Sequence, residues 1–320
     1  METSNPQLPL SQAIGDFVEA KKAKRLSLNT LNDYSITFRK FQAFFPADPP
    51  LAEITVRQIR GFLNSLDGLS KKTVLNHHTA LSSLWHWAVN EEICSENIIR
   101  RVEPPEPEMR RVKPFKRHEV VAMLGALEHS IPYSRLGKQE CAHALPNALR
   151  DRAILLCLLD TGIRASELGN LRAKDLSGRE LSIFGKGAKE RVVPISTETE
   201  KAIEQYLNKE RDGSVPATPL FTTRKGGDMD RHAIRLLIYR VSERARVLDA
   251  HPHRFRHTFA INFLRNGGDP YSLQMILGHS TMDMVKTYLA LAQADLVAAH
   301  QKASPVMCWE LGNSTRSEEA

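Results

Sequence analysis

Three histidines and two arginines fall within residues 251–257, HPHRFRH, directly before the apolar run TFAINFL. On a helix, His253, Arg256 and His257 stand at positions i, i+3 and i+4, so they share one face. Two histidines at this spacing also suit zinc, but a zinc site needs further ligands and the arginines repel a cation. No HExxH glutamate and no cysteine pair is nearby in the sequence. The pattern therefore favours a phosphate or another oxyanion over a metal.

Arginine and histidine together suit an oxyanion for chemical reasons. The planar guanidinium matches two phosphate oxygens, and an imidazole beside it can hold or transfer a proton. We assign this role to His253 and Arg256. His257 is interpreted as a partly buried histidine that forms a hydrogen bond on the core side, and Arg254 as a solvated charge.

Groups of matching chemistry recur in four other segments. TGIRASEL carries Arg164 and Glu167 at a helix junction, GKG presents Lys186 at a turn, LGHS carries His279, and KTYLA carries Tyr288. Together with the heptapeptide they supply a cationic site, a proton donor and a nucleophile. Phosphoryl transfer to an enzyme hydroxyl requires these three components. Neither a metal nor another cofactor is predicted.

The elements that position these residues follow from apolar spacing and from helix-capping residues. NALRDRAILLCLLDTG predicts a buried helix that ends at Gly162, with a short helix in IRASELGNL. LSIFGKGAKERVVPI predicts a β-hairpin around the GKG turn. Pro252 suits the first turn of a helix that runs to Asn266, and a further helix is expected from Asp269 to Gly278.

The N-terminal part is predicted to be helical. One helix is expected over about Ser27 to Phe44, and Ser70 is placed to cap another. Basic residues gather near the predicted helix starts, where helix N-termini favour phosphate. The candidate contacts to a nucleic-acid backbone are Lys21, Lys22, Lys24, Arg25, Lys71 and Lys72. A solvated helix face accounts for each of them equally well.

The composition is that of a globular protein with a polyanionic partner. The chain has 320 residues, of which 42% are hydrophobic, and its formal net charge is +7. Such a charge favours nucleic acid, although a generally positive surface gives the same total. The four cysteines form no CxxC pair, which is typical of reduced intracellular thiols. No apolar run reaches the roughly 18 residues that span a bilayer, so we expect a cytoplasmic protein without membrane contact.

Four segments, TGIRASELGNL, FGKGAKERVVPI, HPHRFRHTFAINFL and LGHSTMDMVKTYLA, resemble in the same order the signature motifs of the tyrosine recombinase family, which includes phage integrases and Xer-like recombinases. The resemblance is strong from about Arg117 to Ala292 and loose in the N-terminal part. It implies that the catalytic residues are Arg164, Lys186, His253, Arg256, His279 and the nucleophile Tyr288, with Glu167 in support. The interval from about Ser130 to Asn147 is longer than in compact Xer-type members and resembles an inserted loop.

The resemblance also implies the reaction and the partners. The substrate is double-stranded DNA, which is cleaved and rejoined through a 3′-phosphotyrosine intermediate without a cofactor. His253 is a candidate to accept the tyrosine proton or to bind phosphate, and Lys186 to protonate the leaving oxygen, with Lys189 as the alternative. A tetramer on DNA is expected, with accessory DNA-bending or directionality factors as possible further partners.

The proline-rich, charged stretch RRVEPPEPEMRRVKPFK marks a domain boundary. We predict a helical, SAM-like core-binding domain over 9–100, a linker over 101–116, a catalytic domain over 117–304 and a tail over 305–320. The expected fold is mainly α, with an all-α N-terminal DNA-binding domain and a small β-hairpin in an α+β catalytic domain. The two domains are expected to form a clamp on DNA.

Two other functions fit the same residues. A type IB topoisomerase would share the chemistry but only relax DNA, and a catalytically inactive DNA-binding regulator of a mobile element would bind without cleavage. The sequence leaves open the target site, the host element, and the choice among integration, excision and resolution.

Overall fold

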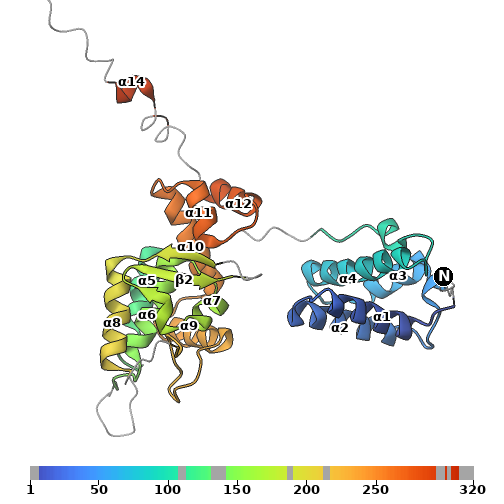
Figure 1. Ribbon diagram of the computed structural model, residues 1–320, viewed down its shortest axis with the longest axis horizontal. Helices are drawn as coiled ribbons and strands as arrows, with labels where there is room; N and C mark the ends of the chain where they lie inside the picture. Colours follow the sequence, from blue (N-terminus) through green and yellow to red (C-terminus); the bar gives the residue numbers. More distant parts are fainter. Residues whose placement is uncertain are drawn as a thin grey trace, which may run out of the picture. The chain divides into compact units, whose positions relative to one another are not determined.

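The computed structural model describes residues 7–106, 113–130, 142–185, 190–211, 217–292, 300 and 304–309. Two compact units divide the chain, Met1–Arg111 and Val112–Ala320, and each is described by itself. The described residues are mostly helical, with one three-stranded antiparallel sheet (Figure 1). This architecture confirms the predicted fold class. No described helix combines the length and apolarity needed to cross a membrane.

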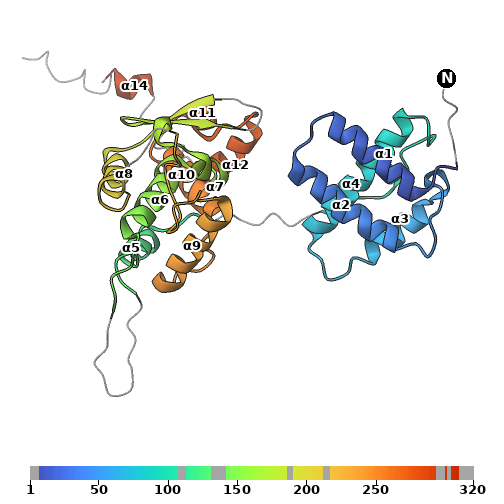
Figure 2. The ribbon, with the colours of Figure 1, turned by 60° about the horizontal axis from the view of Figure 1, so that its bottom comes forward.

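The first unit is a group of packed helices (Figure 2). They are α1 (Leu10–Ala23), α2 (Leu28–Ala43), α3 (Val56–Asn64) and α4 (Lys71–Asn90), with short 3-10 turns η1 (Leu51–Glu53) and η2 (Ile98–Arg101). Ser70 caps α4, as predicted, and Ser27 caps α2, because their hydroxyls accept from the N–H groups of Thr73 and Thr30. Phe38, Phe41, Leu81, Leu84, Trp85 and Ala88 are buried in one apolar core.

The second unit carries the sheet and the remaining helices. The elements are α5 (Arg117–Gly125), α6 (Ala148–Thr161), α7 (Ala165–Asn170), η3 (Ala173–Asp175), β1 (Leu176–Ser177), β2 (Glu180–Phe184), β3 (Glu190–Pro194), α8 (Thr197–Lys209), α9 (Arg231–Ala245), α10 (Pro252–Arg265), α11 (Pro270–Leu277), α12 (Asp283–Ala292) and α14 (Pro305–Cys308). The predicted hairpin is β2 paired with β3, with Leu181 opposite Val193. Strand β1 adds a short third strand beside β2. Leu181, Ile183 and Val193 face the buried core that α6 and α9 share.

Glycines end two helices of this unit. Gly162 follows α6 and Gly278 follows α11, with φ angles of 61° and 64°, a conformation in which other residues are strained. At Gly162 a side chain would also collide with the ring of Phe259, because an added Cβ would lie 2.6 Å from it. Both ends were predicted from the sequence.

The ends of the predicted linker pack against the two cores. Val102 is buried in the core of the first unit and Phe115 in that of the second. The segment between the two cores is therefore shorter than the predicted linker 101–116. Within the second unit, the ends of the longer interval 130–147 run side by side, since His129 and Ala144 form an antiparallel bridge; its middle, 131–141, lies outside the described residues.

The surroundings of Arg254 differ from the prediction. A solvated charge was predicted at this position, but the side chain is 12% exposed and forms an ion pair of 2.9 Å with Glu119. It also donates to the carbonyls of Lys113 and Leu248, and its guanidinium lies 4.0 Å from the centre of the Phe115 ring. Arg254 therefore connects the start of α10 with the start of α5 and the segment before it. Glu119, Lys113 and Phe115 lie more than a hundred residues away in the chain, and the sequence pattern gives no sign of these partners.

Candidate active site

Five elements bring the candidate residues together in the second unit. Arg164 and Glu167 lie at the start of α7, Arg256 and His257 on α10, His279 directly after α11, and Tyr288 on α12. An additional residue, Arg191 on β3, joins them. We call these seven residues the active-site cluster. Helices α10, α11 and α12 pack against one another beside the sheet (Figure 1).

Arg256 is the buried cation of the cluster, with 4% of its surface exposed. Its guanidinium donates to the carbonyls of Gly162 and Leu277, both at 2.9 Å, and to Nε2 of His279 at 2.6 Å. These carbonyls stand at the C-terminal ends of α6 and α11, where unpaired acceptors and the helix dipole favour a cation. Burial and the nearby charge of Arg164 lower the pKa of Arg256 to about 10, so it stays charged at neutral pH.

His279 is held as a neutral imidazole. Arginine can only donate, so Nε2 of His279 accepts and the ring proton lies on Nδ1. Burial and the charges of Arg256 and Arg164 lower the pKa of His279 to about 4, in agreement with that tautomer. Nδ1 is buried and has no hydrogen-bond partner among the described residues. The site therefore contains an unused N–H donor beside an arginine, which suits an incoming oxyanion.

Glu167 orders the arginines. Its carboxylate accepts from Nη1 of Arg164 at 2.8 Å and from Nη1 and Nη2 of Arg191 at 3.2 and 2.9 Å. Burial acts to raise the pKa of Glu167, but the hydrogen bonds and charges of Arg191 and Arg164 outweigh it and lower the pKa. Glu167 is thus a buried carboxylate ion that holds two cations in place.

Arg191 was not among the site residues predicted from the sequence, although the strand pattern carries a signal for it. Strand residues alternate between faces, so Arg191 shares a face with the buried Val193. A charged residue on the inward face of a strand needs a partner. Here the partners are Glu167 and the carbonyl of Ile276, to which Nε donates at 2.8 Å. The tertiary structure, and not the sequence, shows that this face of β3 is buried.

Tyr288 lies at the centre of the cluster, with 3% of its surface exposed. Its hydroxyl is 2.9 Å from Nδ1 of His257, and its ring is nearly parallel to that of His279 at 6.2 Å between centroids. Burial raises the pKa of Tyr288, against the opposing charge of Arg256. His257 is half-buried and hydrogen-bonded, as predicted, and its partner is the tyrosine hydroxyl.

His253 and Arg164 face outward from the same region. His253 is exposed on the first turn of α10 and forms no hydrogen bond with any described residue. Burial of part of its ring and the charges of Arg256 and Arg164 lower its pKa. The side chain of Arg164 is 39% exposed. Lys186 and Lys189 lie outside the described residues; the strands that end and begin beside them are β2 and β3.

Four of the candidate DNA contacts in the first unit do not lie at a helix start, where they were predicted. Lys21 and Lys22 lie in the last turn of α1, followed by Lys24 and Arg25, rather than at a helix start. The dipole at a helix C-terminus attracts the lysines themselves and does not favour phosphate. Lys71 and Lys72 do begin α4, as predicted. Lys21 lines a hollow together with Leu75 and His78 of α4.

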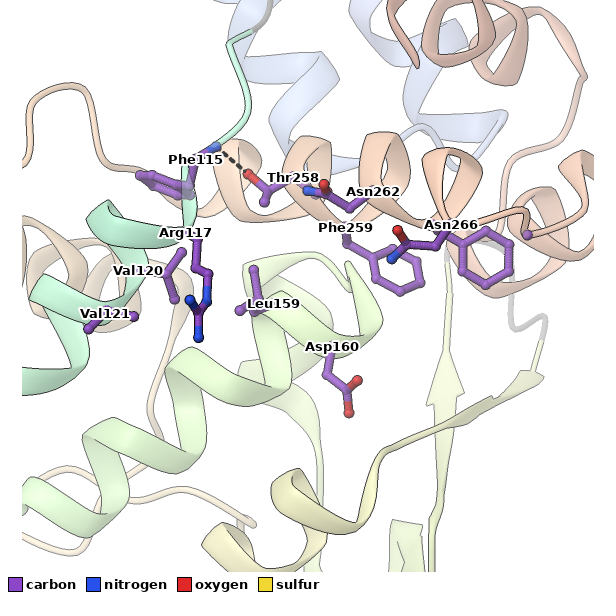
Figure 3. Close-up of a pocket in the computed structure, with 12 residues that line it drawn as sticks. Phe115, Arg117, Val120, Val121, Leu159, Asp160, Thr258, Phe259, Asn262 and Asn266 are labelled. Carbon is purple, nitrogen blue, oxygen red and sulfur yellow. Dashed lines mark hydrogen bonds between the residues drawn. The ribbon is translucent and has the colours of Figure 1, made fainter. Parts of the chain in front are cut away.

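A second face of α10 borders a cavity of about 540 Å³ (Figure 3). Thr258, Phe259 and Asn262 line it from α10, and Leu159 and Asp160 from α6. No member of the active-site cluster lines this cavity. The cluster and the cavity thus use different faces of the helix.

Comparisons with known proteins agree over both units. The phage integrase family matches residues 134–295, and the phage integrase SAM-like domain matches residues 10–103. Tyrosine recombinase XerC of Oceanobacillus iheyensis is 30% identical over 305 residues, 91% of this chain and 95% of that protein. XerC of Pelobacter propionicus is 29% identical over 306 residues, 93% of this chain and 96% of that protein.

One solved structure with the same fold is the Tn1549 transposon integrase in complex with a circular intermediate DNA. It has a TM-score of 0.71 at 19% identity and covers 92% of this chain and 99% of its own. At this identity the likeness speaks for the fold alone.

Proposed function

The chain belongs to the phage integrase family, and from this premise we propose that it is a site-specific DNA recombinase that uses Tyr288 as its nucleophile. One observation carries the assignment. The Tyr288 hydroxyl lies among a buried arginine and two neutral histidines, one of which keeps an unused N–H. Such a site can accept a phosphodiester and hold the charge that develops on it.

The proposed reaction exchanges one phosphodiester for another. The Tyr288 oxygen attacks the phosphorus, a 3′-phosphotyrosine forms, and the bond to the 5′ oxygen breaks. Arg164, Arg256 and Nδ1–H of His279 bind the non-bridging oxygens; a donor of this kind contributes about 3 kcal/mol to the transition state. A 5′-hydroxyl then attacks the phosphotyrosine, which rejoins the strand and releases Tyr288.

Two further residues act on protons and phosphate. Lys186 donates a proton to the departing 5′ oxygen, since an alkoxide leaves poorly and the glycines beside the lysine permit a close approach to DNA. Lys189, from the same turn, is the alternative acid. His253 binds phosphate, because it is exposed beside Arg256 and Arg164.

The remaining proposals concern contacts with DNA, assembly and compartment. Lys21, Lys22, Lys24, Arg25, Lys71 and Lys72 contact the DNA backbone from the first unit, and the two units close on DNA as a clamp. Four copies assemble on DNA to exchange strands, and accessory DNA-bending or directionality factors act at some sites. The protein acts on its DNA substrate in the cytoplasm.

A covalent trap tests this function. Purified protein is incubated with fragmented DNA, and the DNA that stays attached after denaturation is sequenced. We expect one recurring site, lost in Tyr288→Phe, which should still bind DNA. The matched control is Tyr271→Phe, because Tyr271 lies on α11 and is 68% exposed. Covalent attachment of DNA to the Tyr288→Phe variant would contradict the assignment of Tyr288 as the nucleophile. Relaxation without strand exchange would instead indicate a topoisomerase, and binding without any adduct a regulator.

A further inference from the structure

The first turns of α10 are held, on the side away from Arg256, by the segment that leads into α5. We propose that Thr258 and Arg254 are positioning residues that transmit the state of the linker across this helix to Arg256. The linker is here residues 103–112, between the two cores. Attack by Tyr288 is thereby coupled to the binding of the first unit to the same DNA. The inference rests on the proposed function and concerns the regulation of the same site.

Two side chains of α10 bind the backbone of the segment before α5. The N–H of Phe115 donates to the hydroxyl of Thr258 at 2.8 Å (Figure 3). That hydroxyl donates in turn to the carbonyl of Arg254, and Nε of Arg254 donates to the carbonyl of Lys113. The Phe115 ring also packs 4.8 Å from the ring of Phe255. Phe115 and Thr258 are each 4% exposed, so the end of the linker is joined to α10 through buried contacts.

These contacts and the buried cation of the site use opposite sides of one helix. At about 100° per residue, Arg254 and Thr258 lie on one side, roughly opposite Arg256. On its own side Arg256 donates to the carbonyls of Gly162 and Leu277. A shift of the segment before α5 therefore moves α10 relative to these carbonyls, and with it the guanidinium that binds phosphate.

The cavity of about 540 Å³ gives α10 room for such a shift. Phe115 and Thr258 line it, as do Phe259, Asn262 and Phe263 further along the helix (Figure 3). A close-packed interior resists displacement, because every shift forces other side chains to move. Beside a cavity this resistance is smaller, so the hydrogen bonds to the segment before α5 set the position of the first turns of α10.

The other end of the linker is fixed in the first unit. Val102 is buried in the core of that unit, whereas Phe115 is buried in the core of the second. When DNA holds the first unit, it also fixes where the linker starts, and the length of the chain limits where the linker can end. The contacts at Thr258 and Arg254 then hold α10 where Arg256 fits the phosphate. A misplacement of about 1 Å can cost roughly 10²-fold in rate, so a small displacement is sufficient.

The test combines two changes in the full chain. Thr258→Val removes the hydroxyl and keeps the size of the side chain. Insertion of Gly-Ser-Gly-Ser after Glu106 lengthens the linker and replaces no residue. Single-turnover formation of the covalent adduct is measured at saturating DNA, on a nicked duplex that carries the site recovered by trapping. DNA affinity and denaturant unfolding are measured on the same proteins.

Each change alone should slow adduct formation by roughly 10²-fold, while Thr258→Val should leave the DNA affinity unchanged. The double variant should be no slower than the insertion alone, because a slack linker transmits nothing through Thr258. Thr258→Ser should keep most of the rate, since it retains the hydroxyl. A purely structural role for Thr258 predicts instead the same rate loss with either linker.

Thr37→Val is the matched control for the loss of a buried hydroxyl. Thr37 is 3% exposed in the first unit, and its hydroxyl likewise bonds to a helix carbonyl, that of Asp33, and to one distant group, Nδ1 of His77. Its effect on the rate of adduct formation should be small, and it should be the same with both linkers.

The outcomes distinguish the two proposals. Absence of an adduct at Tyr288 in the unaltered protein overturns the proposed function. A normal adduct, with rate losses from Thr258→Val and the insertion that multiply, overturns only the coupling through α10. An unchanged rate in the protein with the insertion also overturns the coupling, and this result stands even if Thr258→Val does not fold.

Discussion

Arg191 holds the carboxylate of Glu167 through two hydrogen bonds, of 2.9 and 3.2 Å, although 24 residues separate them in the chain. Through Nε, Arg191 also binds the carbonyl of Ile276, just before His279. One side chain thus connects the strand that follows Lys186, the start of α7 and the loop that carries His279. The relative positions of the phosphate-binding groups depend on it.

Arg191→Ala should damage both stability and cleavage. Glu167 would keep only Arg164, and breaking a buried ion pair costs about 3 kcal/mol or more. We expect a lower denaturant midpoint for the second unit and slower adduct formation, with Arg191→Lys between the two proteins because lysine lacks the planar fork. An unaltered rate in a destabilised Arg191→Ala protein would show that Arg191 stabilises the fold without positioning the site.

The same pair predicts a dependence on acid. The pKa of Glu167 in the folded protein lies below its ordinary value of 4.5. Its contribution to the free energy of unfolding is therefore present above pH 4.5 and is lost as pH falls through the folded pKa. The stability difference between wild type and Arg191→Ala should shrink over that window. A constant difference down to low pH would contradict the ionised carboxylate.

His279 should remain neutral well below neutral pH. Burial beside Arg256 lowers its pKa to about 4, from an ordinary value of 6.5. The unfolded chain binds this proton more readily, so the free energy of unfolding should fall as pH drops from 6.5 toward 4 and be unaffected by this group above 6.5. NMR titration of the ring signals, assigned by comparison with His279→Asn, measures the pKa directly. A value near 6.5 would remove the argument for an Nδ1–H donor.

Cleavage should persist in excess EDTA. The active-site cluster contains three arginines and a single carboxylate, which is already bound by two of them, so it offers poor ligands for a divalent cation. Within the described ranges, no group of three histidine, cysteine, aspartate or glutamate side chains could hold a metal. Adduct formation in EDTA and in added Mg²⁺ is compared at equal ionic strength. If cleavage strictly required the divalent ion, residues 251–257 would again be candidates for a metal site.

Lys186→Ala should slow cleavage by roughly 10²- to 10⁴-fold if Lys186 is the general acid. DNA with sulfur in place of the bridging 5′ oxygen should restore most of the rate, because a thiolate leaves without a proton. Lys189→Ala is the matched control from the same turn. If the sulfur substrate rescues Lys189→Ala and not Lys186→Ala, the acid is Lys189.

Arg254→Ala should destabilise the second unit by about 3 kcal/mol, because it leaves Glu119 without its buried partner. It also removes the bonds to Lys113 and Leu248 at the start of α10. The measurement is denaturant unfolding, with Arg254→Lys as an intermediate case. Wild-type stability of Arg254→Ala would restore the interpretation of a solvated side chain.

Local features of the fold could be predicted from the sequence because they depend on neighbours within a few residues. Ser27 and Ser70 cap their helices through hydroxyls that reach N–H groups three residues on. Gly162 and Gly278 end α6 and α11 because a left-handed turn disfavours other residues. The order of the four motifs also indicated the family before any contact was known.

Tertiary packing decided which polar groups meet. His257 reaches Tyr288 across 31 residues, Arg256 reaches the Gly162 carbonyl across 94, and Arg254 reaches Glu119 across 135. Helical spacing placed His253, Arg256 and His257 on one face but could not show which histidine would contact the tyrosine. That depends on how α12 packs against α10, and packing is set by the shapes of many distant side chains together. The sequence by itself thus determined the elements and the candidate chemistry, while the packed helices determined the partner of each group.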